Sequence, residues 1–142
     1  MKYICYKYGP HLLGANSKQV GEVEMMFTVM IDLKNATIAR CYDVTEKKMV
    51  AFACLQHSEQ IANFLGQKDF LLGDNITYVD FVLFEHCDFM NWITEGEIYA
   101  RYPNLLAHYN KMKNLPKLKE FFLDDQKCIK SPFNSKHALI NN

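Results

Sequence analysis

Apolar residues recur every three or four positions along much of this chain, which is the spacing expected for helices with one buried face. The longest such pattern runs from Ser17 to Tyr42, and predicts a helix roughly 39 Å long at about 1.5 Å per residue. Its apolar stripe contains Val23, Met26, Phe27, Met30 and Leu33, followed by Thr37 and Cys41. We expect this stripe to face the core.

Glycine and proline residues divide the remaining sequence into further helical segments. The Gly-Pro pair at positions 9–10 ends a helical fragment at the start of the chain. A second long helix is expected from about Thr45 to Leu65, because Gly66 then stops it. Pro103 and Pro116 suit the first turns of two more helices.

A full start signal for another helix lies at residues 76–81. Thr77 is the predicted N-cap, Asp80 is its reciprocal partner in a capping box, and Ile76 and Phe81 flank them as a hydrophobic staple. The helix that follows is apolar around most of its circumference, which predicts a position at the centre of the molecule. The fold class is therefore all-α, a bundle of about five helices with no convincing strand.

Charge and hydropathy narrow the classes of function. Sixteen basic and sixteen acidic residues leave the 142-residue chain with no net charge, which argues against a dedicated nucleic-acid binder or an electrostatic membrane binder. No apolar run reaches the roughly 20 residues that a membrane span needs. We therefore expect neither a nucleic-acid partner nor a membrane span.

Cysteine and histidine usage gives no sign of a metal site or a disulfide framework. The five cysteines are scattered without a C-x-x-C pair, and the five histidines show no metal-ligand spacing. The first ten residues have no long apolar core, so we do not expect a signal peptide. The expected location is the cytoplasm or another reducing compartment.

Four segments carry a resemblance to one protein family. Residues 64–81 read F-L-G-Q-K-D-F-L-L-G-D-N-I-T-Y-V-D-F. Residues 39–42 read A-R-C-Y, and the tyrosine of this segment, Tyr42, follows Asp32 by ten residues. Residues 3–14 and the Y-P-N-L of residues 102–105 add to the pattern. Together they resemble the all-helical C-terminal domain of glutathione transferases, most closely the Mu class, over nearly the whole chain.

The resemblance implies candidate site residues on the first long helix. Tyr42 matches a tyrosine that lines the family's pocket for the electrophilic substrate, and Ile31, Asn35 and Ile38 would face the same pocket. Asp32 matches an aspartate that reaches glutathione across the family's dimer. Asp32 and Tyr42 are about 80° and about 15 Å apart on a helix, so they cannot form one catalytic pair.

Each of these residues also has a plain structural interpretation. A tyrosine at a helix end commonly packs its ring and leaves its hydroxyl in water. Asp32 fits a solvated helix face equally well. We interpret Tyr42 as the relic of a site, so that no residue is assigned as catalytic and no metal or cofactor is expected.

In the family, glutathione is held mainly by an N-terminal thioredoxin-like domain, and no strand–helix–strand pattern occurs in this sequence. We therefore expect a stand-alone helical module. Residues 1–16 would be a remnant helix and linker, residues 17–126 the helical domain, and residues 127–142 a polar tail.

Three functions remain open at this stage. The first is a non-catalytic subunit that binds protein within a larger assembly. The second is a glutathione transferase whose glutathione-binding half lies on another chain or is missing from the gene model; glutathione is expected as a ligand only in this case. The third is a holder of apolar ligands near Tyr42. A homodimer and a heteromeric complex are both compatible with the sequence.

Overall fold

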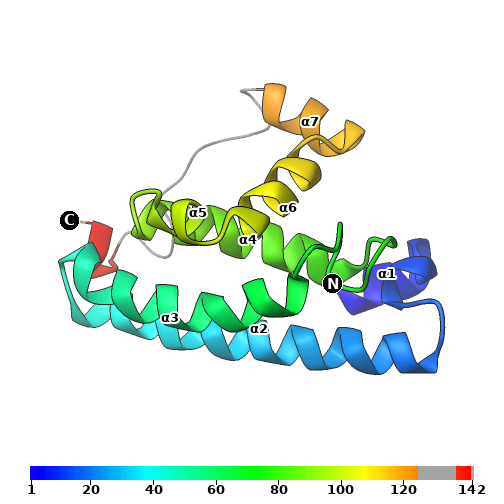
Figure 1. Ribbon diagram of the computed structural model, residues 1–142, viewed down its shortest axis with the longest axis horizontal. Coiled ribbons are helices and arrows are strands. Elements are labelled where there is room, and N and C mark those ends of the chain that lie inside the picture. The colour runs from blue at the N-terminus through cyan, green and yellow to red at the C-terminus, as the bar shows by residue number, and fades with distance from the viewer. Residues whose placement is uncertain (125–136, 142) are drawn as a thin grey trace.

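The computed structural model describes residues 1–124 and 137–141, and within them the chain forms seven α-helices, two short 3-10 helices and no strand (Figure 1). The α-helices are α1 (Lys2–Tyr8), α2 (Ser17–Asp43), α3 (Lys47–Leu65), α4 (Tyr78–Ile93), α5 (Glu97–Arg101), α6 (Pro103–Lys113) and α7 (Pro116–Leu123). The 3-10 helices are η1 (Pro10–Leu13) and η2 (Leu139–Asn141). The prediction of an all-α fold is confirmed.

The two longest helices, α2 and α3, run antiparallel and form one side of the molecule (Figure 1). The first turn of α2 is capped by Asn16, whose Oδ1 accepts a hydrogen bond from the N–H of Gln19 at 3.0 Å. The predicted span of this helix ends one residue short of the observed end at Asp43. α3 begins at Lys47, two residues later than predicted, and ends before Gly66 as expected.

The central helix is α4, which contacts α2, α3 and α6 (Figure 1). Ten of its sixteen residues are buried, because apolar side chains occur on nearly every side of it. Among them, Val79, Leu83, Cys87 and Met90 are fully enclosed. This position agrees with the sequence prediction, and it leaves α4 to form one wall of any cavity in the interior.

The carboxylate of Asp80 fixes the start of α4. Its Oδ2 accepts hydrogen bonds from the N–H and the hydroxyl of Thr77, at 2.8 and 2.9 Å. Its Oδ1 accepts one from the N–H of Leu71 at 2.8 Å. The structure thus contains a capping box between Thr77 and Asp80. Ile76 and Phe81 are half-buried beside it.

One short helix was not foreseen from the sequence. α5 follows a turn in which Glu95 and Gly96 have φ angles of 52° and 93°, a left-handed backbone that breaks the chain direction after α4. α5 has only five residues, which is too short to show a helical apolar period. α5 is therefore the one α-helix of the described residues that the sequence did not indicate.

The predicted polar tail, residues 127–142, lies mostly outside the described residues. Its described end, η2, contacts α2, and there Ala138 and Ile140 are buried. These two apolar side chains belong to the core, so the described end of this segment is partly buried against α2. The reason is physical, since a short apolar segment can bury itself in a groove without forming a long helix.

Candidate functional site

The four residues predicted to face a substrate pocket follow one another along α2 at three- and four-residue spacing. Tyr42 lies in the last turn and is 41% exposed. Asn35 is exposed, whereas Ile31 and Ile38 are half-buried. Of the four, Ile38 borders the cavity described below.

Asp32 lies on a different part of α2. It lines an open groove of about 390 Å³ between α2 and α3, together with His57 and Gln60 of α3. Ile38 instead borders a cavity between α2 and α4. The structure therefore does not bring Asp32 and Ile38 into one site, and α2 itself separates them.

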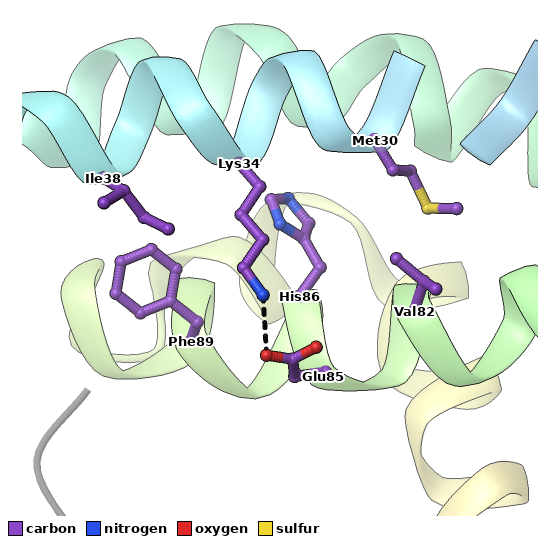
Figure 2. A pocket seen from close by; sticks show the side chains of 7 residues that line it. All are labelled: Met30, Lys34, Ile38, Val82, Glu85, His86 and Phe89. Atoms are coloured by element: carbon purple, nitrogen blue, oxygen red, sulfur yellow. Dashed lines mark hydrogen bonds and ion pairs between the residues drawn. The ribbon is translucent and has the colours of Figure 1, made fainter. Parts of the chain in front are cut away.

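The cavity between α2 and α4 has a volume of about 270 Å³ (Figure 2). Each helix contributes one charged residue to it, Lys34 from α2 and Glu85 from α4, and these form an ion pair of 2.8 Å across the cavity. The rest of the lining is apolar apart from one histidine. It consists of Met30 and Ile38 from α2, and Val82, His86 and Phe89 from α4.

His86 is the unusual residue of this cavity. Its side chain points from α4 toward α2 (Figure 2), and the residue is only 5% exposed. Neither ring nitrogen has a hydrogen-bond partner among residues 1–124 and 137–141. Burial, and to a lesser degree the positive charge of Lys34, lowers the pKa of His86 to about 4, so the ring is neutral at physiological pH.

Sequence reasoning missed this cluster. Lys34, Glu85 and His86 belong to no sequence motif. They lie on two helices, α2 and α4, that are far apart in the sequence and come together only when the chain folds. The one available signal was a histidine inside a helix whose residues are mostly apolar. Such a residue is usually a core histidine with a hydrogen-bond partner, and here the described part of the chain gives it none.

A second surface lies on α1. Its side chains Tyr3, Ile4, Tyr6 and Tyr8 are between 61% and 74% exposed, while only Cys5 faces the core. Lys2 forms an ion pair with Glu24 of α2. Exposed apolar residues gathered on one short helix mark a surface suited to contact with another protein.

Among the described residues, no group of three or more His, Cys, Asp or Glu side chains could hold a metal ion. None of the helices within residues 1–124 and 137–141 is long and apolar enough to cross a membrane.

The long antiparallel pair α2–α3 packs against a buried central helix that begins with a capping box, which is an all-helical domain. The chain belongs to the family "Glutathione S-transferase, C-terminal domain", whose model matches residues 31–125. The resemblance found in the sequence is thereby confirmed.

Individual relatives support the same assignment. The chain is 25% identical to "Glutathione S-transferase class-mu 26 kDa isozyme 51" of Fasciola hepatica, over 95% of this chain and 62% of that protein. It is 26% identical to human "Glutathione S-transferase Mu 3", over 100% of this chain and 63% of that protein. The chain thus spans less than two thirds of the length of these relatives.

A solved structure has the same arrangement of helices. The Pi-class glutathione S-transferase of Onchocerca volvulus superposes with a TM-score of 0.79 and 25% sequence identity, covering 96% of this chain and 67% of that one. The agreement supports the fold of the described residues.

Proposed function

We propose that this glutathione-transferase-like helical domain is a non-catalytic, protein-binding subunit, and that α1 is the surface on which its partner docks. The observation that carries the proposal is the exposure of Tyr3, Ile4, Tyr6 and Tyr8 on one seven-residue helix. Tyrosine is enriched at protein interfaces because its ring is apolar and its hydroxyl can form a hydrogen bond.

The docking helix contacts the bundle through the ion pair of Lys2 and through the buried side chain of Cys5. The ammonium group of Lys2 pairs with the carboxylate of Glu24, and the hydroxyl of Tyr78 donates a hydrogen bond to Glu24 Oε1 at 3.0 Å. The hydrogen bond from Lys2 is the main reason that the pKa of Glu24 is lowered. A surface that is ordered before binding loses less conformational entropy when the partner arrives.

The charge of α1 indicates the chemistry of the partner. The helix carries Lys2 and Lys7 and no acidic residue. Lys2 is already paired with Glu24, so Lys7 is the cation that a partner would meet. We therefore infer a folded protein domain with an apolar, aromatic contact face and carboxylates at its rim.

The test is a double substitution of the docking helix, Tyr3→Ser with Tyr6→Ser, in the tagged chain expressed in its own cells. The expected result is a loss of the high-mass species in size-exclusion chromatography. In the unsubstituted chain, amine cross-linking should join Lys7 to one partner protein, and the variant should lose that link. The variant should keep its thermal stability, because both side chains are exposed.

A matched control lies on α3, where Met49 and Phe52 are 63% and 66% exposed. The variant with Met49→Ser and Phe52→Ser removes as many large apolar side chains and should keep the complex. Loss of the complex in this variant alone would show that the partner docks on α3 and not on α1. If instead the purified chain conjugates glutathione to a chloronitrobenzene, the non-catalytic part of the proposal is wrong.

A second function rests on the length comparison. Because the relatives are longer than this chain, the partner on α1 would in this case be a glutathione-binding domain, and the assembly would be an active transferase. The intact mass of the native protein, compared with 16.6 kDa, tests whether that domain is on the same polypeptide. Retention of the purified complex on immobilised glutathione tests whether it is a separate chain.

A further inference from the structure

A polar cleft lies between the end of α3 and the start of α6. Its volume is about 600 Å³, which falls within the roughly 300–1,000 Å³ of small-molecule sites. Its lining comes from Ala62 and Asn63 of α3, from residues 66–69 of the loop that follows, and from Pro103, Asn104 and Ala107 of α6. The cleft shares no lining residue with the cavity between α2 and α4, so it is a separate place in the fold.

Asn104 joins the two walls of this cleft. Its Nδ2 donates hydrogen bonds to the carbonyl oxygens of Ala62 and Gly66, at 2.7 and 3.1 Å. Because both partners are acceptors, the nitrogen of the amide must face them, and the amide oxygen remains as an acceptor for a ligand. Walls that are joined before binding lose little conformational entropy when a ligand arrives.

Two further amides border the cleft, Asn63 in the last turn of α3 and Gln67 just after it. Both residues are exposed, so their amides can reach a ligand. Each amide carries two N–H donors and one acceptor oxygen. Three amides around one cleft therefore suit a ligand whose groups both donate and accept hydrogen bonds, as hydroxyl groups do.

Lys68 and Asp69 bring one charge of each sign to the cleft, and both are already engaged. Nζ of Lys68 lies 4.1 Å from the centroid of the Phe64 ring, an attractive cation–π contact. The carboxylate of Asp69 forms an ion pair with Lys111 of α6. The two charges of the lining cancel, which favours a neutral ligand over an anion or a cation.

We propose that this cleft binds a small neutral saccharide, whose hydroxyl groups form hydrogen bonds with Asn63, Gln67 and Asn104 and whose C–H groups pack on small apolar residues. The apolar part of the lining consists of Ala62, Pro103 and Ala107. The proposal is independent of docking on α1, because no residue of α1 lines the cleft.

A peptide segment suits the cleft less well than a saccharide. An extended peptide gains affinity when its backbone pairs with the edge of a sheet, and residues 1–124 and 137–141 contain no strand. A saccharide ring instead carries several hydroxyl groups on one small body, so it can reach amides that lie on two different helices.

The experiment is an NMR titration of the purified, 15N-labelled full chain with two probes, maltose and permethylated maltose. Permethylation replaces every hydroxyl hydrogen by a methyl group, so the second probe donates no hydrogen bond. Maltose should shift the side-chain amide signals of Asn63 and Gln67, with a dissociation constant of about 1 mM. The permethylated probe should bind about tenfold more weakly or not at all.

Two double variants locate the site. Asn63→Ala with Gln67→Ala should weaken maltose binding about tenfold, the effect of losing two hydrogen bonds. Gln56→Ala with Asn110→Ala is the matched control. It removes one exposed amide from α3 and one from α6 outside the cleft, and it should keep the affinity.

A third variant and two further probes make the outcome decisive. Ala107→Leu should abolish maltose binding by filling the cleft, and it should fold normally because Ala107 is exposed. Maltobionate, which adds a carboxylate, and the neutral peptide N-acetyl-tetraalanine amide should both bind more weakly than maltose. Absence of maltose binding, equal binding of permethylated maltose, an unchanged affinity in the Asn63 and Gln67 variant, or tighter binding of the peptide would each overturn the proposal.

Discussion

The carboxylate of Asp80 lies 3.1 Å from Nε2 of His108, and both side chains are fully buried. This contact joins the first turn of α4 to the middle of α6. Because an ionised carboxylate only accepts hydrogen bonds, Nε2 carries the proton that faces it. Asp80 therefore connects four groups: His108, the N–H of Leu71, and the N–H and hydroxyl of Thr77.

Asp80→Ala should be among the most destabilising single substitutions in the chain. It leaves the imidazole of His108 and two backbone N–H groups buried without an acceptor, and breaking such a buried pair typically costs about 3–5 kcal/mol. Equilibrium urea denaturation measures the loss. The control is Asp32→Ala, an exposed aspartate on α2, which should change stability by less than about 0.5 kcal/mol. Similar losses in both variants would contradict the role of Asp80.

Asn104 should hold the start of α6 to the end of α3. Its Nδ2 donates to the carbonyl oxygens of Ala62 and Gly66, at 2.7 and 3.1 Å. Asn104→Ala should cost about 1–2 kcal/mol and speed hydrogen exchange in the last turn of α3. Asn110→Ala, at an exposed position of the same helix, should be neutral or slightly stabilising, because alanine favours helix. Unchanged exchange near Ala62 would show that the two bonds contribute nothing.

Most of the helices could be predicted from the sequence because the features that start, stop and orient a helix are local. The α2 stripe, the stop at Gly66 and the box at Thr77 each depend on residues within a turn or two of one another. α5 was not predicted because it has only five residues and follows a left-handed backbone segment at Glu95 and Gly96. The burial of Ile140 was not predicted because it depends on the contact between η2 and α2, which forms only in the folded chain.

The candidate sites were less predictable, for the same reason. Asp80 was recognised as a cap, but its bond to His108 spans 28 residues and depends on how α6 packs against α4. Likewise, Lys34 and Glu85 are 51 residues apart in the sequence. Their ion pair could therefore not be predicted from the spacing of residues. The roles of Tyr42 and Asp32 remain predictions from the resemblance, since their positions on α2 do not assign a ligand to either.

Four cysteines should be unreactive in the native protein. Cys5, Cys41, Cys54 and Cys87 are all buried, and burial raises the pKa of Cys54 to about 11 and that of Cys87 to about 12. The thiolate is the reactive form, so modification by a disulfide reagent at pH 8 should be slow and limited by unfolding. Cys128 lies outside the described residues, so the measurement uses the Cys128→Ser variant.

Asp80→Ala in that background should speed thiol modification by roughly the factor by which it raises the unfolded fraction. Full reaction within the mixing time in the parent, without denaturant, would show that the thiols are accessible in the folded state. Immediate reaction of all four after unfolding in guanidinium is the positive control.

His86 should make the protein less stable in mild acid. Its pKa is lowered from 6.5 to about 4 in the folded chain, so the unfolded chain takes up the proton first as the pH falls. Above pH 6.5 the ring is neutral in both states and contributes no pH dependence. Between 6.5 and 4 the free energy of unfolding should decrease, by about 3 kcal/mol in total for this group.

His86→Leu is the variant that isolates this effect. Leucine has no proton to bind and leaves no unpaired nitrogen in the cavity, so the variant should lose the slope between pH 6.5 and 4 and be more stable in mild acid. Lys34 and Glu85 are the charged groups that face the ring, and Lys34→Met should reduce the slope, because the ammonium group contributes to the lowered pKa. Glu24 loses its stabilising charge only at lower pH, since its pKa is below 4.5. An unchanged slope in His86→Leu, measured by urea denaturation across this pH range, would place the acid sensitivity elsewhere in the chain.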